Sequence, residues 1–179
     1  MPRVRTPVAL MSAAVLTLTV APTLAAQQPS TPRAPVCHTA DLALAWTSGG
    51  TAEPGGSNTA EQVTAVVSVR NTGAGDCTMR GYPQVTLEMG TETEGVQSET
   101  FFRRQTEQPR TVTLKPGGTA TFTLYFLAGE RSDNVIDPGV ADITPPANTS
   151  SRQLHWPWGP VQRQEAATHP LNYVGPVER

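Results

Sequence analysis

The sequence predicts an all-β protein, an Ig-like antiparallel β-sandwich of about seven strands with one disulfide. Three observations predict this fold class. Apolar and polar residues alternate with a period of two, which is typical of strands with one buried face. The 17 prolines and 15 glycines are spread along the chain, and no stretch beyond the N-terminal region carries the apolar stripe of a helix. The only two cysteines, Cys37 and Cys77, lack metal-ligand spacing.

Residues 1–26 have the pattern of a secretory signal peptide. Arg3 and Arg5 make its start positive, residues 8–20 are apolar and uncharged, and small residues precede Gln27. The apolar run is shorter than the roughly 20 residues that a membrane-spanning helix needs. We therefore expect residues 1–26 to be removed, with no membrane span after cleavage. An uncleaved N-terminal anchor is the alternative.

The rest of the chain divides into a linker and a domain. Residues 27–36 read QQPSTPRAPV, a polar stretch with prolines and no periodicity, which predicts a flexible linker. Residues 37–179 have the length of one domain with a sizeable core. No internal repeat or domain boundary interrupts them, so we expect a single β-sandwich domain there.

The first strands are predicted from runs of alternating apolar residues that end at turn-forming residues. The expected inward-facing sets are, in chain order, Ala40, Leu42, Leu44 and Trp46; Val63, Ala65, Val67 and Val69; Val85, Leu87 and Met89; Val112 and Leu114; and Ala120, Phe122, Leu124 and Phe126. Phe101 and Phe102 mark a further extended stretch. Residues 48–58, rich in glycine and small polar side chains, predict a long loop, and residues 116–118 predict a turn.

The alternation weakens after Phe126. Residues 128–152 contain several prolines and glycines and predict a long connection, with one short strand at 140–143. Within that connection, residues 148–150 match the N-glycosylation triplet, which marks a surface loop. Residues 154–156 and 171–174 are two late strand candidates.

Charge excludes two classes of partner. The chain carries a formal net charge of −2, and no block of like charge stands out. Nucleic acid and anionic membranes bind concentrated positive charge, so neither is expected as a partner. We expect a secreted, extracellular protein, released or held at the cell wall, whose partner is an envelope protein or a glycan.

The two cysteines most simply form one disulfide, Cys37 with Cys77, because the pair is expected in an oxidising compartment. In the chain-entropy model, closing a loop of about 40 residues stabilises the fold by about 4 kcal/mol. A reactive thiol is the alternative, and it needs a base close by. His38 follows Cys37, but neighbours along a strand point to opposite faces.

Four segments carry a family resemblance. They are, in chain order, Cys37 with Leu42; Val69-Arg70-Asn71-Thr72-Gly73; Cys77-Thr78-Met79-Arg80-Gly81-Tyr82-Pro83 with Val85; and Val112-Thr113-Leu114-Lys115-Pro116-Gly117-Gly118-Thr119-Ala120. Together they resemble a family of exported actinobacterial domains of unknown function, number four-two-three-two in that series. The resemblance implies an exported or lipid-anchored Ig-like β domain without assigned activity. Members often carry a second cysteine pair toward the C-terminus, and its absence here fits a bond between the two cysteines that remain.

The residues give little support to catalysis or metal binding. His38, His155 and His169 are scattered without ligand spacing, and no G-x-S-x-G nucleophile motif occurs. Asp133-Asn134 with Asp137 is a suggestive run for calcium, but it lacks EF-hand spacing, so a solvated loop is the simpler interpretation. We expect no enzyme, no catalytic residue, no metal and no cofactor.

The first candidate binding feature is the arginine pair Arg103-Arg104. It follows Phe101-Phe102, and alternation puts Arg103 on the face of Phe101. A guanidinium suits capture of a carboxylate or phosphate because it bonds in two places. The alternative is that both arginines are solvated or ion-paired.

The second candidate feature is Trp156-Pro157-Trp158. Residues two apart share a face of an extended segment, and Pro157 confines the segment to a sheet edge or a strand end. Either both indoles cap one end of the sandwich, or they form an exposed platform for a sugar ring or an apolar patch. We expect at least one of the two to be largely buried and no flat exposed platform, with Trp46 buried as well.

These observations predict an exported, non-enzymatic β-sandwich that acts as an envelope or extracellular binding or accessory module. A purely structural domain without a dedicated ligand is one alternative, and an uncharacterised extracellular hydrolase is another. One fold hosts many functions, so the fold does not decide between them.

Overall fold

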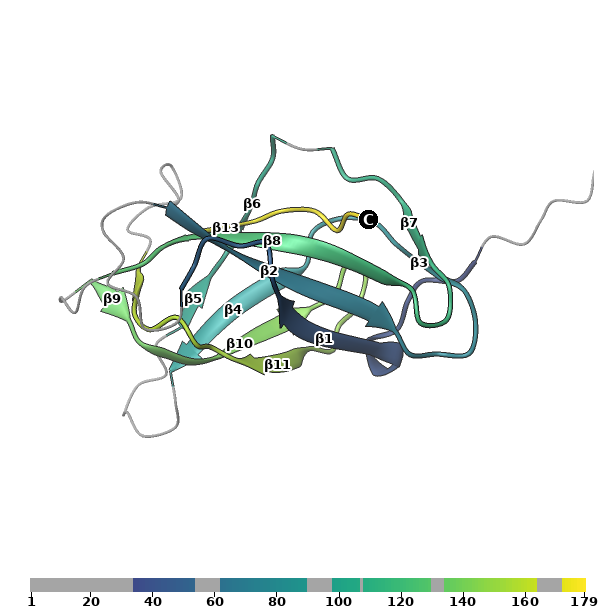
Figure 1. Ribbon diagram of the computed structural model, residues 1–179, viewed down its shortest axis with the longest axis horizontal. Coiled ribbons are helices and arrows are strands. Elements are labelled where there is room, and N and C mark those ends of the chain that lie inside the picture. Colours follow the sequence, from purple (N-terminus) through teal and green to yellow (C-terminus); the bar gives the residue numbers. More distant parts are fainter. Residues whose placement is uncertain (1–33, 54–61, 90–97, 107, 130–133, 164–171) are drawn as a thin grey trace, which may run out of the picture. The chain divides into compact units, whose positions relative to one another are not determined.

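The computed structural model describes residues 34–53, 62–89, 98–106, 108–129, 134–163 and 172–179, the coloured ribbon of Figure 1. Residues Arg33–Arg179 form one compact unit. The predicted signal peptide and residues 27–33 of the predicted linker lie outside the described residues. The end of that linker is fixed to the domain. The Thr78 N–H donates to the Pro35 carbonyl oxygen at 2.7 Å, and the Cys37 N–H donates to the Thr78 carbonyl oxygen at 3.0 Å.

Two larger sheets and two short strand pairs make up the described part of the chain. The first sheet has the order β1-β2-β8-β13-β6, with β1 (Leu42–Thr47), β2 (Gln62–Asn71), β8 (Thr119–Leu127), β13 (Tyr173–Val174) and β6 (Phe102–Arg103). The second has the order β11-β10-β4-β5, with β11 (Arg152–His155), β10 (Pro138–Thr144), β4 (Gln84–Met89) and β5 (Ser98–Thr100). The short pairs are β12 (Val161–Gln162) with β9 (Val135–Ile136), and β3 (Cys77–Met79) with β7 (Val112–Leu114). A single turn of 3-10 helix, Thr39–Asp41, precedes β1.

The core lies between the two larger sheets, which Figure 1 draws as two layers. Strands β2 and β8 form the longest ladder, antiparallel from Gln62↔Leu127 to Arg70↔Thr119. Their alternate residues are buried, and these residues join Val85 and Leu87 of β4 and Ala141 and Ile143 of β10 in one hydrophobic cluster. Alternation therefore places one face of each strand in the core, as the period-two pattern predicts.

The all-β sandwich prediction is confirmed, but the strand count of about seven is too low. The described residues contain thirteen strands. Several of the additional strands are only two or three residues long, which is too short for a period-two pattern to register. The two longest strands, β2 and β8, coincide with predicted runs of alternating residues. The residues expected to face inward in these two strands are all buried.

The short strand predicted at 140–143 is confirmed, but it is longer than expected: β10 runs from Pro138 to Thr144 and lies between β4 and β11 in the second sheet. A register shift between Pro138 and Val140 interrupts its ladder with β4, and the alternation is broken in the sequence there. The expectation for Ala40 is wrong, because Ala40 lies in the 3-10 turn and is exposed instead of facing the core.

The predicted disulfide is confirmed. Cys37 and Cys77 are bonded, with their Cα atoms 4.8 Å apart, and both are buried. No free cysteine remains, which rules out the reactive-thiol alternative. The bond fastens the segment before β1 to β3.

The described residues include no helix long and apolar enough to cross a membrane.

Candidate binding groove

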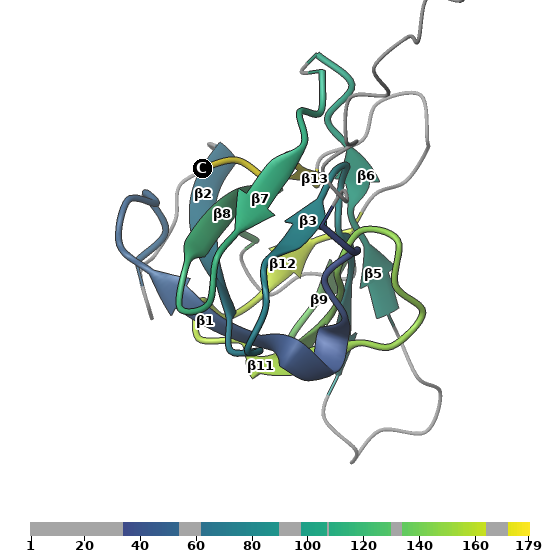
Figure 2. The ribbon, with the colours of Figure 1, turned by 90° about the vertical axis from the view of Figure 1, so that its right-hand side faces the viewer.

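Strand β7 is the element that shapes the candidate site. Among the described strands it pairs only with β3, through Cys77↔Leu114, Thr78↔Thr113 and Met79↔Val112, and Figure 2 shows the two strands side by side. The chain then turns through Pro116 and Gly117, whose φ of +76° suits glycine, and enters β8 of the other sheet. Because β8 pairs with β2 and β13 instead, no strand of the described part of the chain covers the outer edge of β7.

The hydrogen bonds of Thr78 define which groups point out of that edge. Both backbone groups of Thr78 bond to the segment at Pro35 and Cys37, so Thr78 and its partner Thr113 are a non-hydrogen-bonded pair of the antiparallel ladder. The N–H and C=O of Thr113 therefore point away from β3. Within the described residues, no hydrogen bond involves these two groups.

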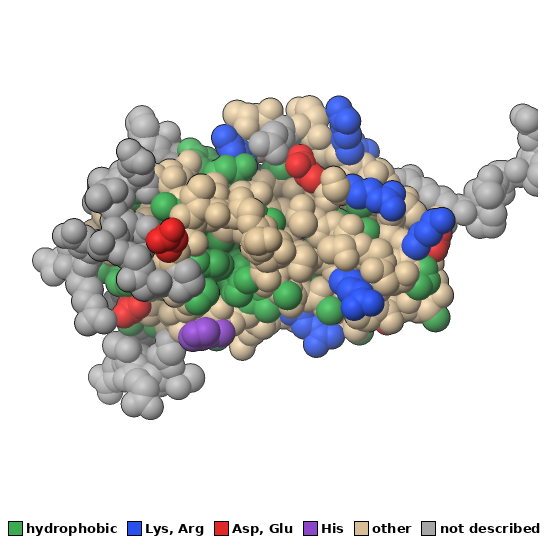
Figure 3. Space-filling model, in the orientation of Figure 1, with side chains coloured by type: hydrophobic (Ala, Val, Ile, Leu, Met, Phe, Trp, Pro, Cys, Tyr) green, Lys and Arg blue, Asp and Glu red, His purple; other side chains and the backbone are tan. Residues whose placement is uncertain are grey.

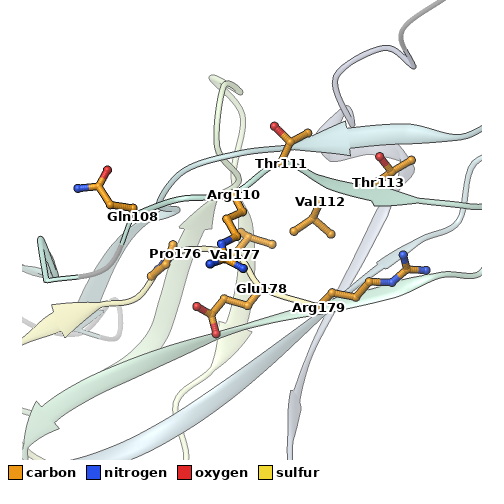
Figure 4. Close-up of a pocket in the computed structure, with 9 residues that line it drawn as sticks. All are labelled: Gln108, Arg110, Thr111, Val112, Thr113, Pro176, Val177, Glu178 and Arg179. Carbon is orange, nitrogen blue, oxygen red and sulfur yellow. The ribbon is translucent and has the colours of Figure 1, made fainter. Parts of the chain in front are cut away.

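A groove of about 650 Å³ lies along this edge. Figure 4 draws its lining residues, with Thr111 and Thr113 on β7 and its approach, and Glu178 and Arg179 on the C-terminal segment opposite. The described residues that line it are Gln108, Arg110, Thr111, Val112, Thr113, Pro176, Val177, Glu178 and Arg179. Val112 and Val177 are buried and form an apolar floor, while the rim is polar and charged.

The C-terminal wall of the groove is held in place by backbone bonds. Glu178 exchanges two hydrogen bonds of 2.8 Å with Thr121 of β8, and the Val177 N–H donates to the Gly81 carbonyl oxygen at 2.9 Å. The C-terminal segment thus extends the first sheet beside β8, and β7 lies on the opposite side of the groove. The groove lies between these two backbone segments. Hydrogen bonds to β8 and Gly81 hold the first segment, and pairing with β3 holds the second.

Positive charge collects around the groove. Arg110 and Arg179 line it and are exposed, and Arg80 is tied beside it by a 3.3 Å hydrogen bond from Nε to the Pro109 carbonyl oxygen. Of the described residues in the lining, Glu178 is the only one with an acidic side chain. Figure 3 shows blue side chains gathered on the right-hand half of the molecule, the half in which Figure 1 draws β3 and β7.

The arginine pair predicted as a binding feature is divided between two environments. Arg103 is exposed at the edge strand β6, but Phe101 is buried and lies outside that strand. The guanidinium carbon of Arg104 lies 4.0 Å from the centroid of the Tyr125 ring, within cation–π distance. The two arginines thus differ in exposure and in contacts, and neither is among the residues that line the groove.

The tryptophan pair is buried, which confirms that it is not a flat exposed platform. Trp156 is 3% exposed and Trp158 is 8% exposed. Their ring centroids are 4.9 Å apart in an edge-on arrangement, and Trp156 packs 4.9 Å from Phe126 of the core. Trp46 is the least buried of the three tryptophans, contrary to expectation. A ligand has no access to the pair as a stacking surface.

The histidines and oxygen-rich loops form no metal site within the described residues. His38 and His155 are exposed, and the Nδ1 atom of His155 lies 3.2 Å from the Gly139 carbonyl oxygen. His169 and Asp133 lie outside the described residues. Asn148, in the glycosylation-like triplet, is not a free surface residue: its amide nitrogen donates to the carbonyl oxygens of Cys37 and Pro146 at 2.9 and 3.1 Å.

The groove was not among the sequence-based candidates. Alternation at 111–115 placed Thr111 and Thr113 on an outward face, but an uncovered strand edge depends on which strands pair. The C-terminal wall gave no signal at all, because residues 176–179 show no alternation.

Comparison with known families matches residues 37–177 to the family described as "Domain of unknown function (DUF4232)". The match covers the four segments between Cys37 and Ala120 that carried the resemblance, and it extends over most of the groove. Comparisons with curated proteins and with solved structures found no match.

Proposed function

The chain belongs to this family of domains of unknown function, and from that premise we propose that it is an exported, non-enzymatic binding module of the envelope or the extracellular space. The β7 groove is its binding site in this proposal. Such a role fits a rigid β scaffold that presents a few polar groups at one edge.

The groove is the observation that carries the proposal. It combines an apolar floor, unpaired backbone donors and acceptors, and exposed arginines, and ligand sites are concave surfaces with a few convergent polar groups. The sequence-based candidates do not compete with it, because Trp156 and Trp158 are packed in the core and Arg104 lies against Tyr125. Arg110, Thr111 and Arg179 of the groove are exposed instead.

The disulfide supports the exported part of the proposal. Disulfides persist in oxidising compartments and are rare in the cytosol. The Cys37–Cys77 bond is buried and joins the start of the domain to β3, beside the strand that forms the groove. An oxidising compartment therefore preserves the bond that holds β3, the strand with which β7 pairs.

Capture of envelope components by immobilised protein tests this proposal. We expect solubilised envelope and supernatant fractions of the producing cells to contain a component that the protein retains. Retention should be lost in the double variant Arg110→Glu/Arg179→Glu, which reverses both guanidinium charges of the groove.

A matched control separates the groove from bulk charge. The double variant Arg70→Glu/Arg103→Glu makes the same change in net charge at two exposed arginines outside the groove, and it should retain the component. Equal loss in both double variants would refute the groove as the site. Retention of no component by any variant would favour a purely structural domain.

A further inference from the structure

The uncovered edge of β7 presents a specific kind of chemistry. Thr113 directs one N–H donor and one C=O acceptor into the groove. In an extended chain, residues two apart direct their backbone groups to the same side, so those of Thr111 are expected to point the same way. An alternating row of donors and acceptors is satisfied by another extended backbone, which is how peptides add a strand to an exposed sheet edge. A glycan or a small ligand satisfies only some of these groups.

We propose that the groove binds an extended acidic segment of a partner protein, which adds to β7 as a further strand. This inference rests on the proposed binding function and names its ligand class. The added strand lies over Val112 and Val177 with its backbone along β7, and its acidic side chains meet the arginines at the rim.

Charge selects an acidic segment. Arg110 and Arg179 form no ion pair within the described residues, and Arg80 adds a third guanidinium beside the groove. Glu178 is the only acidic side chain among the described residues that line the groove, so the described side chains here carry more positive than negative charge, although the whole chain has a formal net charge of −2. Complementary charge at an interface steers the partner and excludes strands of the wrong sign.

Two other occupants are disfavoured by the sequence. Residues 27–33 of this chain read QQPSTPR, whose prolines lack N–H donors and whose charge is positive. A second copy of the chain, paired antiparallel through β7, would bring the arginine-lined grooves of both copies to one interface, with Arg110 and Arg179 of each copy on it. Juxtaposed like charges at an interface are unfavourable.

The probe is an end-blocked peptide, Thr-Glu-Val-Thr-Val-Glu-Val-Thr, titrated into the isotope-labelled purified protein. We expect it to shift the amide signals of β7 and to slow hydrogen exchange at the Thr113 N–H at least tenfold. Exchange protection of Thr113 is the readout that distinguishes strand addition from simple charge attraction. The same peptide with Gln in place of Glu should bind several-fold more weakly.

Single variants of the protein test the arginines. Arg110→Gln and Arg179→Gln should each weaken peptide binding about two- to fivefold, the range for exposed ion pairs. Arg103→Gln is the matched control and should leave the affinity unchanged, because Arg103 is exposed but does not line the groove. Chemical unfolding of each variant verifies that the fold is intact.

Three outcomes would overturn the strand-addition inference. They are no binding of the peptide at millimolar concentration, binding without protection of Thr113, and equal weakening in Arg103→Gln. Inorganic polyphosphate serves as a competitor: if it reproduces the shifts and the peptide protects no amide, the groove is a polyanion site. If envelope capture still depends on Arg110 and Arg179 in any of these cases, the binding function stands and only its ligand class is wrong.

Discussion

The indole Nε1 of Trp46 donates a hydrogen bond to the carbonyl oxygen of His155 at 2.8 Å. Trp46 lies in β1 at the edge of the first sheet, and His155 lies in β11 at the edge of the second. The bond therefore joins the two sheets along one side of the sandwich. The ring of Trp158 packs edge-on against Trp46, with centroids 4.5 Å apart, so an aromatic cluster closes this side behind the bond.

This arrangement predicts unequal accessibility of the three tryptophans. Trp46 is half-buried, while Trp156 and Trp158 are almost fully buried, so acrylamide should quench mainly the emission of Trp46. We expect the quenching constant to fall in Trp46→Phe and not in Trp158→Phe. An unchanged constant in Trp46→Phe would contradict the burial of the other two rings.

Removal of the disulfide should weaken the fold without abolishing it. The double variant Cys37→Ser/Cys77→Ser is expected to lower the free energy of unfolding by about 2–4 kcal/mol, because the bond restricts the unfolded chain. The Val36–Thr78 bridge and the hydrophobic core remain. Denaturant unfolding of oxidised wild type and variant measures the difference. A variant as stable as the wild type would show that the bond contributes nothing to stability.

Much of the fold could be predicted because long strands with one buried face leave a period-two record. Strands β2 and β8 bury every second residue. The disulfide could be predicted because a chain with two cysteines allows one intramolecular pairing. Strand β10 was underestimated, because Pro138 and a register shift break its pattern. Strands of two residues such as β9 and β12 leave no pattern.

The binding groove could not be predicted for a different reason. An uncovered edge is a property of pairing between strands far apart in the sequence, and nothing local to Thr113 reveals that β8 pairs elsewhere. The tryptophan pair shows the converse: Trp156 and Trp158 are conspicuous in the sequence as a possible binding feature. In the structure they pack against Trp46 and Phe126 and belong to the core.

Asn148 should be important for stability rather than for glycosylation. Its amide nitrogen donates to the carbonyl oxygens of Cys37 and Pro146, and its oxygen accepts from the Thr39 N–H at 3.0 Å. Asn148→Ala should lower the free energy of unfolding by about 2–3 kcal/mol, since several partly buried backbone groups lose a partner.

Ser150→Ala is the matched control for Asn148→Ala. It also destroys the glycosylation triplet, but the side chain of Ser150 is exposed, and its carbonyl group, which accepts from Thr39 Oγ1, is retained. Its effect should stay within about 0.5 kcal/mol. Equal destabilisation by both variants would point to the triplet instead of the hydrogen bonds of Asn148.

Asn71 should stabilise the strand that forms the groove. It is 1% exposed, and its amide nitrogen donates to the carbonyl oxygens of Gly75 at 2.8 Å and of Leu114 in β7 at 3.1 Å. Asn71→Ala removes the donor from the buried Leu114 carbonyl oxygen and from the partly buried bond to Gly75, so we expect a loss of about 2–4 kcal/mol in the free energy of unfolding. Faster amide exchange should appear in β7. Thr72→Ala, at the exposed neighbour, should change neither quantity. Unaltered exchange in β7 of Asn71→Ala would mean that the β3–β7 pair holds this strand without Asn71.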